Sequence, residues 1–128
     1  MKEVIAVVRM NMMNKTKRAL GQAGISSFTA RKVMGRGKGK VDHLLLKGAA
    51  EGYDEAIAQL GPGPKLIPKR MITVIVPDEL VPTVVDAVIE TNQTGSPGDG
   101  KIFVCPVNEA YRVRTGESGD DVLDEVTA

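Results

Sequence analysis

The sequence predicts an α+β domain with a ferredoxin-like βαββαβ order of elements. The prediction depends first on the hydrophobic pattern, in which a β-branched strand, a stretch of helical periodicity and another strand follow one another twice. It depends also on length and composition, because 128 residues with 42% hydrophobic content are typical of one globular domain. This order of elements places both helices on one face of an antiparallel sheet.

The first strand–helix–strand unit spans residues 2–34. Residues 2–10 ("KEVIAVVRM") and residues 25–34 ("ISSFTARKVM") are rich in β-branched and apolar side chains and predict strands. Residues 11–24 between them predict a helix that Gly24 ends. The apolar face of this helix comprises Met12, Thr16, Ala19, Leu20 and Ala23.

The second unit begins with a predicted strand at residues 70–76 ("RMITVIV"). A helix follows at residues 79–91, with Asp78 as its expected N-cap and Pro82 in the first turn, where amide groups lack helical partners. Residues 101–107 ("KIFVCPV") predict the last strand of the unit. Residues 110–117 suggest a short fifth strand that carries Arg112 and Arg114 on one face.

The face of the sheet without helices needs a cover. The predicted strands are apolar on both sides, so an open face would be a large hydrophobic patch. We therefore expect the chain to form oligomers through this face. Cys105 lies in the middle of the last predicted strand, and we expect it to be a small buried apolar side chain.

Charge is unevenly distributed along the chain. Residues 1–70 carry 14 Lys/Arg and 5 Asp/Glu, whereas residues 71–128 carry 3 Lys/Arg and 11 Asp/Glu. The stretch "RKVMGRGKGK" (31–40) is either a solvated basic face or an anion site in which glycine amides lie beside cations. The acidic tail, residues 117–128, predicts a frayed solvated end, with pairing to a basic surface as the alternative.

A long connection joins the two units. Residues 37–69 exceed the roughly 15 residues beyond which loops are usually functional or disordered. Residues 51–60 within it have helical spacing, and either pack on their own domain or dock into a partner. His43, the only histidine, is expected to be exposed there.

Several classes of protein are disfavoured. One cysteine excludes an internal disulfide and a Cys-based zinc site. The chain has no apolar run near the ~20 residues of a membrane helix and no visible secretion signal, so we expect a cytoplasmic protein without stable membrane insertion. With two Phe, two Tyr and no Trp, it lacks the aromatics of a base-stacking platform, so nucleic-acid binding is not expected.

The stretch "TGSPGDGKIFV" (94–104) approaches a phosphate-binding P-loop without matching it. Gly95, Gly100 and Lys101 fit the glycine and lysine spacing, but Ile102 replaces the metal-binding Ser or Thr, and a strand follows instead of a helix. An ordinary turn is the simplest alternative. A different phosphate cradle is the other, because crowded glycines let successive amides converge on an anion beside a lysine.

These segments together resemble PII-type nitrogen signal-transduction proteins. "TGSPGDGKIFV" followed by "YRVRTGE" (111–117) is similar to a signature of that family, and "GISSFTARKVMGRGKGK" (24–40) resembles the entry into its large T-loop. The resemblance implies a domain at residues 1–116 with a T-loop at about 37–69, followed by the acidic tail. It also implies a ferredoxin-like homotrimer that is a sensor and not an enzyme, with ATP and ADP competing for clefts between subunits.

The resemblance assigns site residues one by one. The residues implied to bind the nucleotide are Thr29, Gly35, Gly37, Lys38, Ile75, Gly98, Asp99, Gly100 and Lys101, with Arg112 and Arg114 reaching the phosphates from the adjacent subunit. Those implied to bind 2-oxoglutarate are Gly37, Lys38, Gly39, Lys40 and Lys69. Mg²⁺ would arrive with the nucleotide, without protein side chains as ligands. Gly39 departs from the family, which often has a magnesium-coordinating Gln there.

The enlarged loop resembles that of the PII-like proteins whose genes lie beside nitrogenase genes. That resemblance implies a homotrimer, alone or assembled with a paralogous PII-like protein, that inhibits the dinitrogenase component of nitrogenase. A regulator of an ammonium channel, or of another nitrogen-metabolism target such as glutamine synthetase, is the alternative within the family. An ATP-hydrolysing enzyme is the alternative outside it, although no base or water-positioning residue is evident near Lys101.

Overall fold

The computed structural model describes residues 1–36 and 66–125, and these form one sheet with helices on one side. The sheet has four antiparallel strands in the order β2-β3-β1-β4, which confirms the ferredoxin-like prediction. The strands are β1 (Lys2–Arg9), β2 (Thr29–Gly35), β3 (Ile67–Val76) and β4 (Lys101–Pro106). The helices are α1 (Met13–Gln22) and α4 (Val81–Asn92), with short 3-10 turns η1 (Met10–Met12), η2 (Asp78–Leu80) and η3 (Asp120–Val122).

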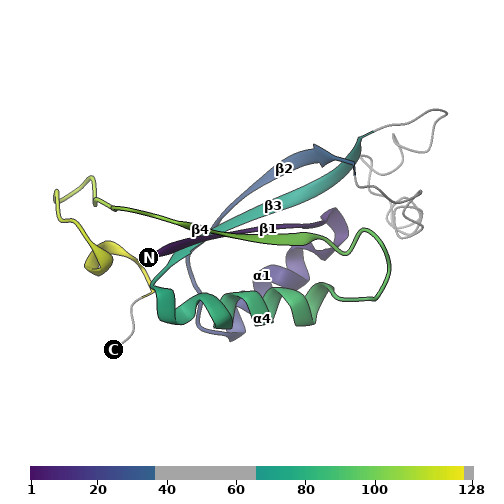
Figure 1. The fold of residues 1–128 in the computed structure, drawn as a ribbon, viewed down its shortest axis with the longest axis horizontal. Helices are drawn as coiled ribbons and strands as arrows, with labels where there is room; N and C mark the ends of the chain where they lie inside the picture. Colours follow the sequence, from purple (N-terminus) through teal and green to yellow (C-terminus); the bar gives the residue numbers. More distant parts are fainter. Residues whose placement is uncertain (37–65, 126–128) are drawn as a thin grey trace.

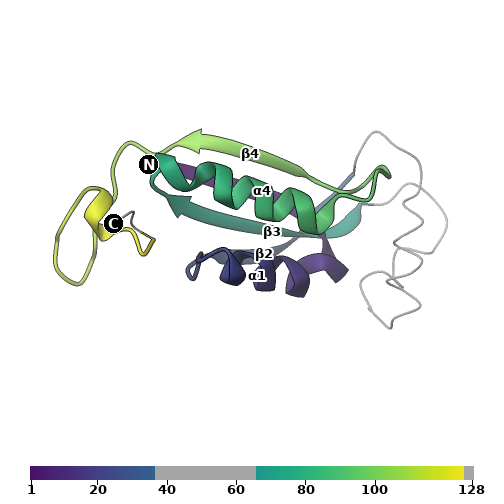
Figure 2. The same ribbon diagram turned by 90° about the horizontal axis from the view of Figure 1, so that it is seen from below.

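The core lies between the sheet and the two helices. Alternate residues of β1, such as Val4 and Val8, point toward the helices and are 1% exposed. They pack with Ile72 and Val74 of β3 and with helical side chains such as Leu20. Figures 1 and 2 show α1 under the β2 side of the sheet and α4 under the β4 side.

A buried polar contact joins the helices. Thr16 of α1 is fully buried, and its Oγ1 donates to the carbonyl of Met12 at 2.8 Å and accepts from Nδ2 of Asn92 at 3.0 Å. Asn92, in the last turn of α4, also donates to the carbonyl of Val88. The predicted face of the first helix is confirmed at Thr16 and Leu20, its buried positions. Gly24 ends this helix as predicted, with a φ of 86°.

Three local predictions are wrong. Asp78 does not cap α4, because the helix begins after η2 and has no side-chain cap. Its Oδ1 instead accepts from Nζ of Lys2 at 3.0 Å and lies 3.1 Å from the N-terminal amine, and these hydrogen bonds lower the pKa of Asp78. Residues 110–117 do not form a fifth strand, since only an isolated bridge joins Tyr111 to Ser118. The second strand is also displaced, as residues 25–28 precede β2.

The sheet face opposite the helices carries exposed apolar side chains and is open in a single chain. Ile75 is 39% exposed and Phe103 is 51% exposed on strands β3 and β4. Cys105 lies on the same face, opposite Glu3, and is half-buried, which corrects the expectation of a buried thiol. No helix within residues 1–36 and 66–125 is long and apolar enough to cross a membrane.

Candidate functional site

The segment of residues 93–100, here named the glycine loop, leads from α4 into β4 and contains three glycines. Gly95, Gly98 and Gly100 have φ angles of 85°, 96° and 123°, a region that other residues rarely adopt. Gly100 also approaches β1 closely, since a Cβ atom there would lie 2.1 Å from the carbonyl oxygen of Val7. A side chain at position 100 would therefore push the loop away from the sheet.

Asp99 holds this loop together from within. Its Oδ2 accepts from the amides of Thr94 at 2.7 Å and Gly95 at 3.0 Å, and its Oδ1 accepts from the Thr94 hydroxyl and from Nη1 of Arg9 at 2.8 Å. Burial opposes ionisation, but these hydrogen bonds outweigh it and hold the pKa of Asp99 well below its ordinary value. The carboxylate is thus occupied by the chain itself and organises the loop.

Arg9 is a site residue that sequence reasoning missed. Its side chain is buried at the end of β1, where Nη1 pairs with Asp99 and Nη2 donates to the carbonyl of Pro97 at 2.9 Å. A charged residue that ends an apolar strand was the signal that could have found it, because such a residue is buried only when paired. Arg9 neutralises the one carboxylate in a loop that would otherwise repel anions.

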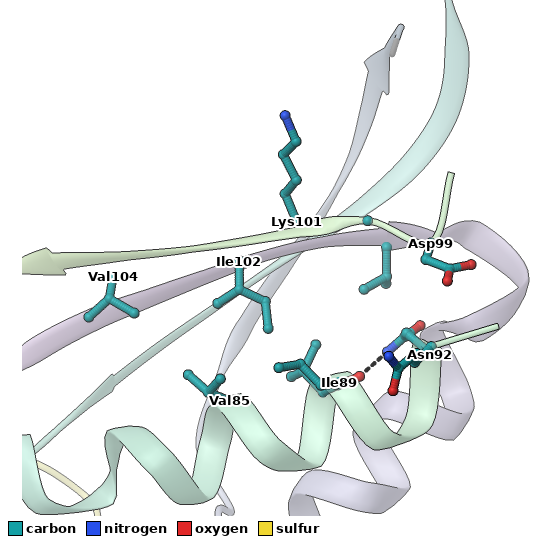
Figure 3. A pocket seen from close by; sticks show the side chains of 11 residues that line it. Val85, Ile89, Asn92, Asp99, Lys101, Ile102 and Val104 are labelled. Carbon is teal, nitrogen blue, oxygen red and sulfur yellow. Dashed lines mark hydrogen bonds between the residues drawn. The ribbon is translucent and has the colours of Figure 1, made fainter. Parts of the chain in front are cut away.

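Two lysines stand on the open face beside this loop. Lys101 begins β4 opposite Val7, and Lys69 lies opposite Arg9, so all these side chains are on the same face of the sheet. Nζ of Lys69 donates to the carbonyl of Gly98 at 3.2 Å. Figure 3 shows the exposed Lys101 side chain pointing away from α4. The loop thus presents cationic side chains next to glycine backbone.

The two predicted arginines lie at the other end of β4. Arg112 and Arg114 belong to a tight turn of residues 112–117, here named the arginine turn. In it the amide of Arg112 donates to the carbonyl of Glu117 at 2.8 Å, and Gly116 adopts a φ of 75°. Nη1 of Arg112 lies 3.1 Å from Oε1 of Glu117, whereas Arg114 is exposed. Figures 1 and 2 place this turn beyond the sheet end opposite the glycine loop.

The predicted residues therefore form two groups. The first lies at the glycine loop and comprises Lys69, Gly98, Asp99, Gly100 and Lys101, with Gly35 at the same end of the sheet but on the opposite edge strand. The second lies toward the other end of the sheet and comprises Thr29, Ile75, Arg112 and Arg114. One chain does not bring the groups together. Gly37, Lys38, Gly39 and Lys40, together with His43 and residues 51–60, lie outside the described residues.

An apolar cavity of about 450 Å³ lies between α4 and β4, and it shares Asp99, Gly100 and Lys101 with the candidate site as lining residues. Val85 and Ile89 of the helix face Ile102 of the strand across it, on the side of the sheet away from the Lys101 amine (Figure 3). Asn92 closes one end, and its buried Oδ1 has no hydrogen-bond partner among the described residues. Nothing in the hydrophobic pattern distinguished these cavity residues from ordinary core.

Comparison with known proteins confirms the family resemblance. The sequence profile of the family described as "Nitrogen regulatory protein P-II" matches residues 1–117. A protein of Methanobacterium ivanovii named "Nitrogen fixation nifHD region GlnB-like protein 2" is 46% identical over 123 residues, covering 96% of this chain and 99% of that protein.

Two further relatives match along almost their whole length. A protein of the same name from Methanothermobacter marburgensis is 44% identical over 125 residues, covering 96% of this chain and 100% of its own. The "Nitrogen regulatory protein P-II" of Haemophilus influenzae is 38% identical over 123 residues, with coverage of 96% and 100%. The chain therefore belongs to the P-II family of nitrogen regulatory proteins, in its nitrogen-fixation-associated branch.

Proposed function

We propose that this protein is a cytoplasmic homotrimeric sensor that binds ATP or ADP between subunits and controls a protein partner. The single observation that carries the proposal is the separation of the candidate residues along β4. Lys101 at its start and the arginine turn beyond its end are separated by a strand that spans about 17 Å at 3.4 Å per residue. A polyphosphate that contacts both groups needs Lys101 of one subunit and Arg112 of the next.

The charges of the two groups suit such a ligand. Lys101 supplies a compact ammonium group, and Arg112 and Arg114 supply forked donors for phosphate oxygens. Asp99 does not oppose binding, because Arg9 and the loop amides already hold its carboxylate. Mg²⁺ would be bound by the phosphates rather than by a cluster of protein side chains.

2-Oxoglutarate is the second proposed effector. Lys69 lies beside the loop, within hydrogen-bond distance of the Gly98 carbonyl, and its ammonium group suits one carboxylate of a dicarboxylic acid. The other contacts would come from Gly37–Lys40. Occupancy of the cleft would favour some arrangements of residues 37–69 over others, to the extent that the ligands bind those arrangements better.

The proposed target is the dinitrogenase component of nitrogenase, inhibited through residues 37–69. The names of several relatives place them in a nitrogen-fixation gene region, which favours this target over an ammonium channel or glutamine synthetase. A paralogous PII-like protein is a second proposed assembly partner. Members of the family are regulatory proteins, and we propose no catalysis for this one.

Complementation between subunits tests the shared site. Calorimetry with ATP should show binding to the wild type, strong weakening by Lys101→Ala or Arg112→Ala alone, and loss in the double variant. Mixed trimers of the two single variants should regain wild-type affinity at one cleft per trimer, because one interface combines both intact residues. Lys17→Ala, exposed on α1, is the control. Unchanged binding in the double variant, or no recovery in mixed trimers, would contradict the proposal.

A further inference from the structure

The chain after β4 forms a segment that is fastened at both ends. Its beginning is tied to the sheet, since the amide of Val107 donates to the carbonyl of Met1 at 3.2 Å. It then makes the arginine turn and η3 and comes back to the body of the domain at Glu125 (Figures 1 and 2). The segment of residues 107–125, here named the C-terminal loop, is therefore closed and not a free tail.

Glu125 makes the second fastening. This side chain is buried, with the residue only 7% exposed, and its Oε1 accepts from the amide of Ser26 at 2.6 Å, from the Ser26 hydroxyl and from the amide of Ser27 at 3.1 Å. The serines directly follow Ile25, a core residue that is 1% exposed. The anchor point therefore directly adjoins the core. The expectation of a frayed solvated tail is wrong as far as Glu125.

Contacts inside the C-terminal loop connect this anchor to the arginine turn. The amide of Gly119 donates to the carbonyl of Ala110 and to Oε1 of Glu109, each at 3.0 Å. Nη2 of Arg112 lies 3.5 Å from the carbonyl of Asp121, which belongs to η3. The Arg112 guanidinium is thus held between Glu117 on its own turn and the stretch that leads to Glu125.

We propose that Glu125 is a positioning residue, a latch that orders the arginine turn for a ligand on the neighbouring subunit. The inference rests on the function proposed above. A loop fixed at both ends has fewer arrangements than a tail fixed at one, so opening the latch adds an ordering cost to every ligand contact made by Arg112. Ser26 and Ser27 are the receiving half of the latch.

The first test measures the latch without any nucleotide. Amide hydrogen exchange of the full-length protein should become faster over residues 109–119 in Glu125→Ala, and also at Ser26 and Ser27. Asp124→Asn removes an exposed acid one position away and should leave exchange unchanged. Equal exchange over residues 109–119 in Glu125→Ala and the wild type would overturn the latch, whether or not the protein binds ATP.

The second test asks whether the latch acts through Arg112. Glu125→Ala should weaken ATP binding by roughly three- to tenfold, the effect of ordering one or two side chains. Glu125→Gln should weaken it less, because the amide oxygen still accepts hydrogen bonds from the Ser26 and Ser27 amides. Asp124→Asn should bind ATP as the wild type does.

A double-mutant cycle separates positioning from general stability. In an Arg112→Ala background, Glu125→Ala should add little further loss of ATP affinity, since the residue through which it acts is already absent. Losses that add in full would overturn the proposal. If the wild type itself does not bind ATP, the proposed function fails, and the exchange measurement still decides whether Glu125 orders the C-terminal loop.

Discussion

Nη1 of Arg9 lies 2.8 Å from Oδ1 of Asp99, and this ion pair ties the end of β1 to the loop before β4. Removal of Arg9 takes the cation from Asp99, whose side chain is 23% exposed, but leaves it the hydrogen bonds from Thr94 and Gly95. We expect Arg9→Ala to lower the free energy of unfolding by about 1.5–3 kcal/mol, measured by urea denaturation. Lys17→Ala on α1 should change it little. A small effect of Arg9→Ala would mean that the loop amides alone satisfy Asp99.

The hydrogen bonds that Asp99 accepts from Thr94, Arg9 and Gly95 predict a dependence of stability on pH. The pKa of Asp99 is lowered in the folded protein from an ordinary value of 3.8, so its contribution to stability is complete above pH 3.8 and is lost as the pH falls below that value. The difference in unfolding free energy between wild type and Asp99→Asn should be constant at pH values well above 3.8 and should shrink as the pH falls below 3.8. A difference that grows on acidification would contradict the assignment.

Gly100 should tolerate no side chain. Gly100→Ala would place a Cβ atom 2.1 Å from the carbonyl oxygen of Val7, whereas Gly95→Ala would meet nothing within 4 Å, and both positions have a positive φ, 123° and 85°. We expect Gly95→Ala to lower the unfolding free energy by about 1–2 kcal/mol, from backbone strain alone. Gly100→Ala should lower it by about 1–3 kcal/mol more, from the added overlap. Equal losses would show that the loop moves away from β1 without cost.

The buried hydrogen bond between Thr16 and Asn92 should contribute to the free energy of unfolding. Thr16→Val keeps the shape but removes the acceptor for Nδ2 of Asn92, which is buried. We expect a loss of about 1–3 kcal/mol in unfolding free energy, as for a buried polar group left without this partner. Thr91→Val is the control, because the Thr91 hydroxyl donates to the carbonyl of Ala87 within its own helix. This substitution should change the unfolding free energy little.

Glu117 competes with any anion for Arg112, since its Oε1 lies 3.1 Å from Nη1. If phosphates bind Arg112, Glu117→Gln should tighten ATP binding by up to about fivefold, the strength of an exposed ion pair. Asp120→Asn, a like change of charge in the same loop, should have a smaller effect. Weaker ATP binding in Glu117→Gln would instead mean that the carboxylate positions the guanidinium.

The open sheet face should mediate assembly. Phe103 is 51% exposed there, and a charge in its place would be buried without a partner in any interface that covers the face. Phe103→Asp is expected to reduce the molar mass measured by light scattering from that of the oligomer to that of a smaller species. Gln22→Asp, at an exposed position of α1 on the other side of the sheet, adds the same charge and should leave the mass unchanged.

The sequence predicted the strands and helices because their signal is local. Alternation in β1 and helical spacing around Thr16 and Leu20 reflect which side chains face the core, and each pattern is complete within a few residues. Gly24 and Pro82 were likewise predicted correctly, since each acts through its own backbone. The glycine loop was recognisable for the same reason.

The errors at Asp78, Glu125 and Arg9 concern contacts between distant parts of the chain. Asp78 carried a capping pattern, but the N-terminus and Lys2 lie close enough in space to bind it instead. Glu125 stood in an acidic tail that looked solvated, and only the fold brings Ser26 to it across 99 positions. Arg9 was missed because its partner lies 90 positions further along. Short-range patterns carry no information about such pairs.

The contact of Gly100 with Val7 has a consequence for how this chain can vary in length. The close approach of Gly100 to Val7 fixes the register of β4 against β1. The side chains of β4 then alternate between the two sides of the sheet. Insertion of a single residue after Gly100 would move Lys101 to the place of Ile102, against α4, and Ile102 to the place of Phe103 on the open face. Insertion of two residues would keep each side chain on its present side of the sheet, so the length of this strand can change without such a shift only in steps of two.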